Sequence, residues 1–248
     1  MNKDDLFKAR FDDLAAKALR EGVSHSRFLT PGEAESARQM FARRRDVQLV
    51  LDGGFPDAER LIAALVNPLW GAYRPEGALC ALKITFRRQD SLSHRDILGA
   101  TLALGISRDT LGDIEIADGE AFLVCAAGVA GFIAENLEQA GRVGLEVCPI
   151  PLSLLPGKTV SLAQKADTVP SMRLDAVLCS AFNLSRAQAL EYIKAGSVQL
   201  RHRECLNPSQ QVDEGDIFSI RGLGRGKVTE IHGLTRKGRL RIQIGIFI

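Results

Sequence analysis

Two short stretches of the chain combine residue types that could bind or transform a ligand. In the C-terminal third, Arg173-Leu174-Asp175 and Ser185-Arg186 each open a predicted helix. An arginine at the start of a helix lies beside free backbone N–H groups, and the two together favour a phosphate. In the middle of the chain, His94-Arg95-Asp96 could supply a general base and the carboxylate that orients it.

The middle stretch is better explained as the beginning of a helix. Ser93 is a good N-cap residue, and Asp96 follows three positions later, where a carboxylate faces the positive end of the helix dipole. Three successive side chains on a helix point in different directions and do not converge on one substrate. We therefore predict no catalytic residue in this stretch.

Basic residues are unevenly distributed along the chain. From Met172 onward there are 12 Lys and Arg against 7 Asp and Glu, whereas the preceding 171 residues contain 20 basic and 23 acidic residues. The bias is sharpest from Arg221 to Arg241, where 7 basic residues accompany a single acid, Glu230. In a chain whose total net charge is only +2, this distribution indicates a polyanionic partner for the C-terminal end.

The five cysteines are odd in number, widely scattered and lack the close spacing of a zinc site. They indicate reduced thiols, and hence a cytoplasmic protein without a metal site. No sequence signature indicates a cofactor, so we predict none. The longest uncharged apolar run, Ala121–Ala134, is shorter than the roughly 20 residues that a transmembrane helix needs. We expect a monomer with no membrane segment.

Residues 1–74 predict an N-terminal helical α/β region. Apolar residues recur at helical spacing from Leu6 to Ala18, and Thr30-Pro31-Gly32-Glu33 combines a capping box with a proline at the first helical position. Val47–Leu51 has the composition of a strand, and residues 57–65 predict a third helix.

Residues 75–170 predict a ferredoxin-like domain followed by a linker. The expected elements are a strand at Ala81–Phe86, a helix at Ser93–Leu104, strands at Asp113–Ile116 and Ala121–Cys125, a helix at Ala127–Ala140 and a strand at Leu145–Cys148. This β-α-β-β-α-β order is shared by RNA-recognition domains, which stack bases on strand aromatics. Here the strands offer only Phe86 and Phe122, and residues 149–170 indicate a last strand or two and then the linker.

Residues 171–248 predict two short helices on a small sheet, so the whole chain belongs to the α+β class. The first helix follows Arg173, and the second begins at Ser185, whose capping partner is Gln188. Gly196 ends the second helix, and strands follow to the C-terminal end.

This arrangement, with its series Arg-Leu-Asp, Ser-Arg, Gly-x-Val and Glu-Gly-Asp, resembles the S-four (S4) domain. The resemblance covers about 50 residues and implies binding of structured RNA. One departure is the pair Arg201-His202, because the family often has Asn-Gly at the turn after the first strand.

The resemblance and the basic residues together define the predicted RNA-binding residues. They are Arg173, Ser185, Arg186, Lys194, Arg201, His202, Arg203, Arg225, Lys227, Arg236, Lys237 and Arg239. Secondary RNA contacts are predicted at His94, Arg95 and Arg108, and weaker ones at Lys158 and Lys165. Contacts of arginine and lysine with phosphates give an affinity that falls with salt and carry little sequence information. Ser185 is better explained as a helix cap than as a direct ligand.

A wider resemblance covers nearly the whole chain. The residues that carry it are Phe28-Leu29-Thr30-Pro31, Gly53-Gly54-Phe55, Ala58-Glu59-Arg60, residues 92–99, Leu104-Gly105-Ile106-Ser107-Arg108, Leu111-Gly112-Asp113-Ile114, Arg221-Gly222-x-Gly224-Arg225 and Thr235-Arg236-Lys237-Gly238-Arg239. Together they resemble the YlmH family of bacterial and plastid S-four proteins. The resemblance implies a non-catalytic protein on the large ribosomal subunit, with rRNA or tRNA as partners, that handles stalled peptidyl-tRNA complexes.

Two alternatives remain open at this point. S-four domains are often fused to RNA-modifying enzymes, although this chain lacks a phosphate-binding P-loop and a nucleophile elbow. Gly222-Leu223-Gly224-Arg225-Gly226 follows a predicted strand but leads into strand-like sequence, unlike the glycine-rich loop expected of a methyltransferase. A protein-interaction adaptor is the second alternative, and its sign would be an exposed apolar patch.

Overall fold

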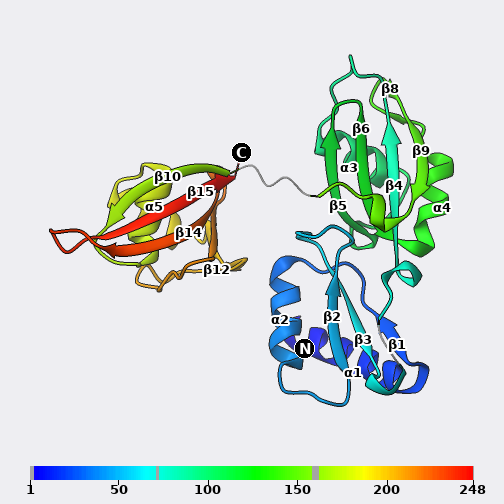
Figure 1. Cartoon of the computed structure of the whole chain (residues 1–248), viewed down its shortest axis with the longest axis horizontal. Coiled ribbons are helices and arrows are strands. Elements are labelled where there is room, and N and C mark those ends of the chain that lie inside the picture. The colour runs from blue at the N-terminus through cyan, green and yellow to red at the C-terminus, as the bar shows by residue number, and fades with distance from the viewer. Residues whose placement is uncertain (1–2, 71–72, 158–161, 248) are drawn as a thin grey trace. The chain divides into compact units, whose positions relative to one another are not determined.

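The computed structural model describes residues 3–70, 73–157 and 162–247. It divides into two compact units, Met1–Lys158 and Thr159–Ile248 (Figure 1). Helices and antiparallel sheets occur in both units, which confirms the α+β class. Each unit has its own hydrophobic core.

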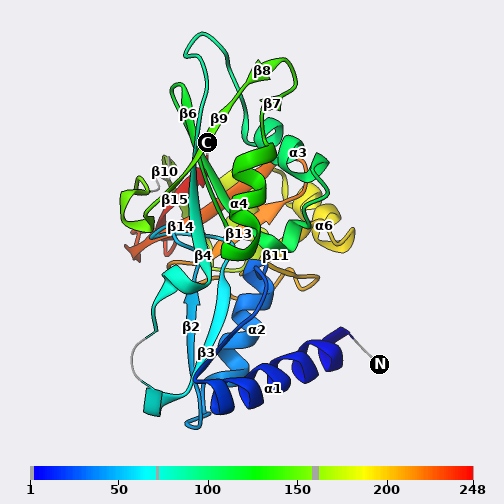
Figure 2. The same cartoon turned by 90° about the vertical axis from the view of Figure 1, so that its right-hand side faces the viewer.

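The N-terminal part of the first unit is a three-stranded antiparallel sheet with two helices. Its elements are α1 (Lys3–Glu21), β1 (Val23–His25), α2 (Pro31–Phe41), β2 (Gln48–Asp52) and β3 (Ile62–Val66), with the strand order β1-β3-β2. Both helices lie beside the sheet (Figure 2). Apolar residues such as Phe11, Phe41 and Leu65 form the core between them. The capping box predicted at the start of α2 is confirmed, because Thr30 and Glu33 bond reciprocally.

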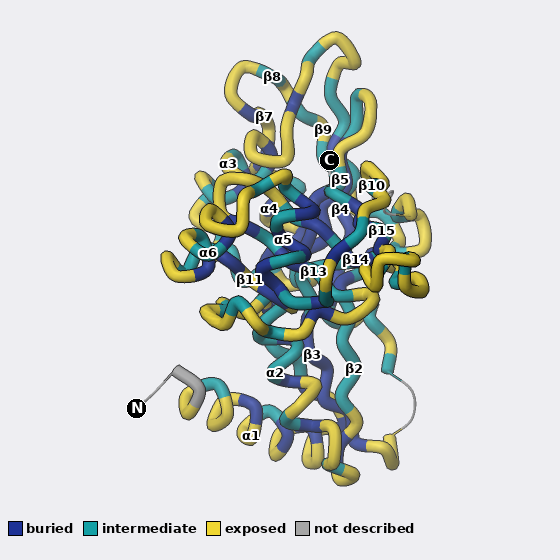
Figure 3. The backbone as a smooth tube through the Cα atoms, turned by 90° about the vertical axis from the view of Figure 1, so that its left-hand side faces the viewer, coloured by how far each residue is buried: buried dark blue, intermediate teal, exposed yellow. Residues whose placement is uncertain are grey.

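The third helix predicted over residues 57–65 is wrong. Residues Ile62–Val66 instead form β3, the central strand of the sheet, and all five are buried (Figure 3). A central strand covered on both faces has a continuous apolar sequence, and over so short a run this pattern does not differ from that of a buried helix.

The second part of the first unit has the predicted β-α-β-β-α-β order. Its main elements are β4 (Leu79–Thr85), α3 (His94–Ala103), β5 (Leu111–Ala117), β6 (Glu120–Ala126), α4 (Ala127–Asn136) and β9 (Glu146–Ile150). The strand order β5-β6-β4-β9, antiparallel throughout, is that of a ferredoxin-like fold. The described residues of this unit also contain short 3₁₀ segments at Pro68–Trp70, Pro75–Gly77, Arg108–Thr110 and Leu152–Leu154.

Helix α4 is shorter than predicted. It ends at Asn136, because the next residues form the two-residue strands β7 (Gln139–Ala140) and β8 (Val143–Gly144). Gly141, the residue that follows the predicted helix, lies in the turn between these strands with a φ of +63°. A glycine with a positive φ suits both sites, so the sequence alone does not distinguish them.

The two parts of the first unit are joined by buried apolar and polar contacts. One apolar cluster contains Phe28 and Ile62 from the N-terminal part and Phe122 and Val124 from the ferredoxin-like part. Beside it, the carboxylate of Asp113 accepts hydrogen bonds from the backbone N–H groups of residues 59 and 60, at 2.7 and 3.2 Å.

The second unit is a six-stranded antiparallel sheet with two helices on one face. Its elements are β10 (Leu162–Val169), α5 (Leu174–Phe182), α6 (Arg186–Lys194), β11 (Val198–Leu200), β12 (Arg203–Glu204), β13 (Ile217–Ile220), β14 (Gly224–Leu234) and β15 (Leu240–Phe247). The strand order is β10-β15-β14-β13-β11-β12. Leu178 of α5 and Ile193 of α6 share one core with Phe218, Val228 and Ile242 of the sheet.

The segment expected to be a linker contributes a strand to this sheet. Residues Leu162–Val169 form β10, which pairs along its whole length with β15, from Leu162 opposite Phe247 to Val169 opposite Leu240. The partner strand lies more than 70 residues further along the chain, so no local pattern indicates this pairing.

The turn between β11 and β12 has an uncommon backbone conformation. Arg201 and His202 form a two-residue loop in which both have a positive φ, 52° and 62°. This is the geometry of a type I′ turn, which favours Asn-Gly. Arg201 is also held by acids, because its guanidinium lies 2.8 Å from Asp213 and 2.5 Å from Asp216.

We predict that His202→Gly stabilises the second unit by about 0.5–1 kcal/mol, because glycine adopts a positive φ without the steric cost borne by other residues. Urea denaturation of the full chain, followed by circular dichroism, measures the change. Arg201→Gly is the matched comparison, and it should gain less because it also removes the ion pairs with Asp213 and Asp216. An unchanged or lowered stability of His202→Gly would contradict the strain argument.

Candidate nucleic-acid interface

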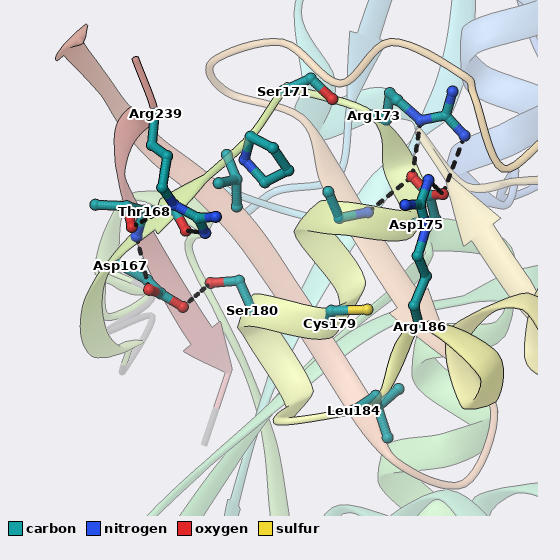
Figure 4. Close-up of a pocket in the computed structure, with 13 residues that line it drawn as sticks. Asp167, Thr168, Ser171, Arg173, Asp175, Cys179, Ser180, Leu184, Arg186 and Arg239 are labelled. Atoms are coloured by element: carbon teal, nitrogen blue, oxygen red, sulfur yellow. Dashed lines mark hydrogen bonds and ion pairs between the residues drawn. The ribbon is translucent and has the colours of Figure 1, made fainter. Parts of the chain in front are cut away.

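Two arginines meet on one buried carboxylate at the start of both helices of the second unit. Asp175, the second residue of α5, is 1% exposed. Arg173 donates to it in a bidentate manner, from Nε to Oδ1 at 3.1 Å and from Nη2 to Oδ2 at 3.0 Å. Arg186, the first residue of α6, donates from Nη2 to Oδ2 at 3.3 Å (Figure 4).

The local structure fixes Asp175 in place. The backbone N–H groups of residues 174 and 175 donate to the carbonyls of Gln210 and Pro208, so the loop after β12 secures the start of α5. The N–H of Ala176 donates to Oδ1 of Asp175 at 2.9 Å. The carboxylate thus satisfies a helix N-terminus and two guanidinium groups together.

The sequence predicts free backbone N–H groups at the starts of α5 and α6, but side chains accept hydrogen bonds from some of these groups. In α6, Ser185 accepts from the N–H of Gln188 and Gln188 bonds back to Ser185, which confirms the predicted capping box. The cap and the Asp175 contacts occupy N–H groups at both helix starts. An anion here would therefore meet the outward N–H groups of the guanidiniums, whose side chains are 37% exposed in Arg173 and 71% in Arg186.

The charge state of Asp175 follows from the balance of these neighbours. Burial alone would raise the pKa of its carboxyl group, but the hydrogen bond from Arg173 and the charges of Arg173 and Arg186 outweigh burial and lower the pKa below its ordinary value of 3.8. Asp175 is therefore ionised at neutral pH and holds both arginines electrostatically.

A pocket of about 370 Å³ extends from this cluster along α5 (Figure 4). It is lined by Asp167, Thr168, Val169, Pro170, Ser171, Arg173, Asp175, Ala176, Cys179, Ser180, Leu184, Arg186 and Arg239. At the end opposite Asp175, Arg239 donates from Nε to the hydroxyl of Thr168 at 3.0 Å, and Ser180 donates to the carboxylate of Asp167 at 2.6 Å. Asp167 and Thr168 were not predicted as site residues, because they lie in the segment expected to be a linker.

The predicted RNA-binding residues are distributed over several parts of this unit. Arg173, Ser185, Arg186 and Arg239 lie at or beside the pocket, and Arg236 and Lys237 lie with Arg239 in the hairpin between β14 and β15. Lys194 is the exposed last residue of α6, and His202 and Arg203 lie at the β11–β12 turn beside the acid-bound Arg201.

Arg225 and Lys227 lie on the other face of the sheet. Val228 of the same strand belongs to the core under the helices, so its neighbour Lys227 points away from them. The guanidinium of Arg225 lies 4.1 Å from the ring centroid of Phe247, a cation–π contact. The twelve predicted residues therefore do not form one continuous surface.

The secondary candidates in the first unit have different environments. His94 and Arg95 are exposed at the start of α3, where the predicted capping box of Ser93 and Asp96 is confirmed. Arg108 points inward and donates to the carbonyls of Leu111 and Gly112, at 2.7 and 3.3 Å.

The two weaker candidates, Lys158 and Lys165, lie in sequence near the division between the two units. Lys165 donates to the carbonyl of Ser180 and, at 2.5 Å, to the side chain of Asn183. Lys158 lies outside the described residues.

An exposed apolar group, the sign expected of an adaptor, occurs in the first unit. Leu69 is 92% exposed and Trp70 67% exposed, and Trp70 packs against Gly22.

Among the described residues, no group of three or more potential ligands could hold a metal ion. Within the same ranges, no helix combines the length and the apolar character needed to cross a membrane.

We predict that Asp175→Asn lowers the free energy of unfolding of the second unit by about 1–2 kcal/mol at pH 7. The loss is small for a buried charge because solvent screens the charges of the partly exposed Arg173 and Arg186. Since the pKa of Asp175 is lowered in the folded protein, its contribution is complete above the unfolded pKa and is lost as the pH falls through the folded pKa. Urea denaturation of both proteins between pH 7 and pH 3 should show the difference shrinking below about pH 4. A difference that stays constant down to pH 3 would contradict the assignment.

Comparisons with known proteins agree on a family. Residues 7–68 match the model "YlmH, N-terminal", residues 78–153 match "Putative RNA-binding domain in YlmH", and residues 172–218 match "S4 domain". None of these three models describes a catalytic domain.

Two related proteins extend the comparison. The chain is 35% identical over 198 residues to "Ribosome-associated protein quality control protein P2" of Bacillus subtilis (strain 168), covering 79% of this chain and 77% of that protein. It shares the fold of "Cell division protein ylmH from Streptococcus pneumoniae", with a TM-score of 0.52 and 17% identity over 62% of this chain and 94% of the other. The chain therefore belongs to the YlmH family of RNA-binding proteins, with a C-terminal S4 domain.

Proposed function

We propose that the protein binds structured RNA, rRNA or tRNA, through the face of its S4 domain that carries Arg173, Arg186 and Arg239. The arrangement of Arg173 and Arg186 around the buried Asp175 is the observation that carries the proposal. Two guanidinium groups held side by side present outward N–H groups in fixed positions, which suits the oxygens of an RNA backbone. The role is binding and not catalysis.

We further propose that this RNA lies on the large ribosomal subunit, in the cytoplasm, and that the protein takes part in quality control of stalled peptidyl-tRNA complexes. The support is the 35% identity with a relative named a ribosome-associated quality control protein. The three parts at residues 1–74, 75–170 and 171–248 would then act together, with β10 added to the sheet of the last part.

The two alternatives differ in their support. An RNA-modifying activity would need a catalytic group near bound RNA, and the most prominent acid at the site, Asp175, is engaged by two arginines. A protein-interaction adaptor is favoured by the exposed Leu69 and Trp70. That observation is compatible with RNA binding by the other unit.

We predict that the double variant Arg173→Glu, Arg186→Glu loses RNA binding, because it replaces two phosphate-binding cations with anions. Fluorescence anisotropy with a structured rRNA fragment or tRNA, at several salt concentrations, measures the affinity. Replacing the same two arginines with glutamine should reduce the slope of log affinity against log salt by about 1–2.

The matched control is Arg43→Glu, Arg45→Glu, which makes the same change in net charge at exposed positions of the first unit. Circular dichroism verifies that each variant is folded. Unchanged RNA affinity in the Arg173, Arg186 variant would refute this surface.

We predict that the tagged protein comigrates with large ribosomal subunits when lysate is sedimented at low salt and is released at high salt, as expected of phosphate contacts. Crosslinking and sequencing of the bound RNA then identifies rRNA or tRNA. Absence from every ribosomal fraction would contradict the ribosomal role and leave RNA binding to be tested separately.

A further inference from the structure

The pocket beside α5 has a cationic group at each end. Arg173 and Arg186 lie at the end near Asp175, and Arg239 lies at the other end, where it bonds to Thr168 (Figure 4). Arg239 comes from the hairpin between β14 and β15, whereas the other two arginines come from the helix starts. The separation indicates a ligand with negative charge at two positions.

Between the two ends the lining is small and mostly apolar. Ala176, Cys179 and Ser180 share one face of α5 because they are three and four residues apart. Pro170 and Leu184 complete this middle section. Burial raises the pKa of the Cys179 thiol, so the sulfur is a neutral, apolar part of the lining at neutral pH. A flat uncharged group fits here better than a second ion pair.

A carboxylate lies where the middle section meets the Arg239 end (Figure 4). Asp167 accepts from the hydroxyl of Ser180 at 2.6 Å and from the N–H of Thr168, also at 2.6 Å, which fixes its carboxylate. A carboxylate has about four lone-pair positions, so it can still accept from the ring N–H or amino group of a base.

We propose that this pocket takes one unstacked nucleotide of a structured RNA, with its base on the α5 face and its two flanking phosphates at the two arginine ends. This inference rests on the proposed function and deepens it. Structured RNA is read mainly where bases leave the stack, in loops and bulges, and such bases are held by guanidinium planes and by hydrogen bonds to their edges. A pocket of about 370 Å³ lies in the size range of small-ligand sites.

The test compares three RNA hairpins that differ at one position: fully paired, with a single-nucleotide bulge, and with the same bulge lacking its base. The full-length protein should bind the bulged hairpin about five- to tenfold more tightly than either of the others, the lower part of the range for stacking contacts. Equal affinity for all three would overturn the nucleotide pocket and leave RNA binding intact. No binding to any of them would overturn the proposed function as well.

A variant that fills the pocket separates the two claims. Ala176→Leu should remove the preference for the bulge, so that the bulged, base-free and paired hairpins bind with affinities within about twofold of one another. The matched control is Ala195→Leu, the same change at an exposed residue at the end of α6 that does not line the pocket. A bulge preference that survives in folded Ala176→Leu would overturn the assignment.

A measurement on the unmodified protein does not depend on how the variant folds. Alkylation of Cys179, followed by peptide mass spectrometry, should slow severalfold in the presence of the bulged hairpin but not of the base-free one. Cys148, which is exposed in the first unit, is the internal control. Equal alkylation of Cys179 with both hairpins would overturn the proposal.

Discussion

The carboxylate of Asp175 is the constraint on which the candidate site depends. A charged group that is almost completely removed from water must be compensated by hydrogen bonds and opposite charge. Here the compensation comes from the N–H of Ala176, from Arg173 and from Arg186, and therefore from the starts of two different helices. The same requirement that stabilises the fold thus places two guanidinium groups together at the surface. One end of the pocket is formed as a consequence.

In the first unit, a buried carboxylate and an arginine join two parts of the chain. The buried carboxylate of Asp113 accepts from the backbone of residues 59 and 60, and the guanidinium of Arg60 donates to the carbonyls of Phe28, Arg108 and Leu111. These donors join the N-terminal part to the ferredoxin-like part. An arginine that satisfies buried carbonyls stabilises an internal contact, whereas one that is only partly satisfied by a carboxylate retains N–H groups for a ligand. Arg60 is of the first kind and Arg186 of the second.

Local patterns predicted much of this fold, and the failures were non-local. The caps at Thr30, Ser93 and Ser185 and the β-α-β-β-α-β order of the elements followed from short-range signals, and the structure confirms them. The sequence pattern predicts a helix at β3 because both faces of that strand are buried, and it does not indicate β10 because the partner strand is distant in sequence.

The site was predictable only in part for the same reason. The sequence identified Arg173 and Arg186 from their positions at helix starts, but it did not indicate that Asp175 binds both. Nor did it separate Arg201, which is held by Asp213 and Asp216, from arginines that face the pocket. Which acid binds which arginine is decided by packing between elements, and a linear pattern does not contain that information.

Ultraviolet crosslinking of the full-length protein to ribosomal RNA and tRNA, read out by peptide mass spectrometry, tests the central claim most directly. The account predicts crosslinked residues at the starts of α5 and α6, around Arg173 and Arg186, and in the β14–β15 hairpin that carries Arg239. Crosslinks confined to the first unit, or to the sheet face of Arg225 and Lys227, would contradict it.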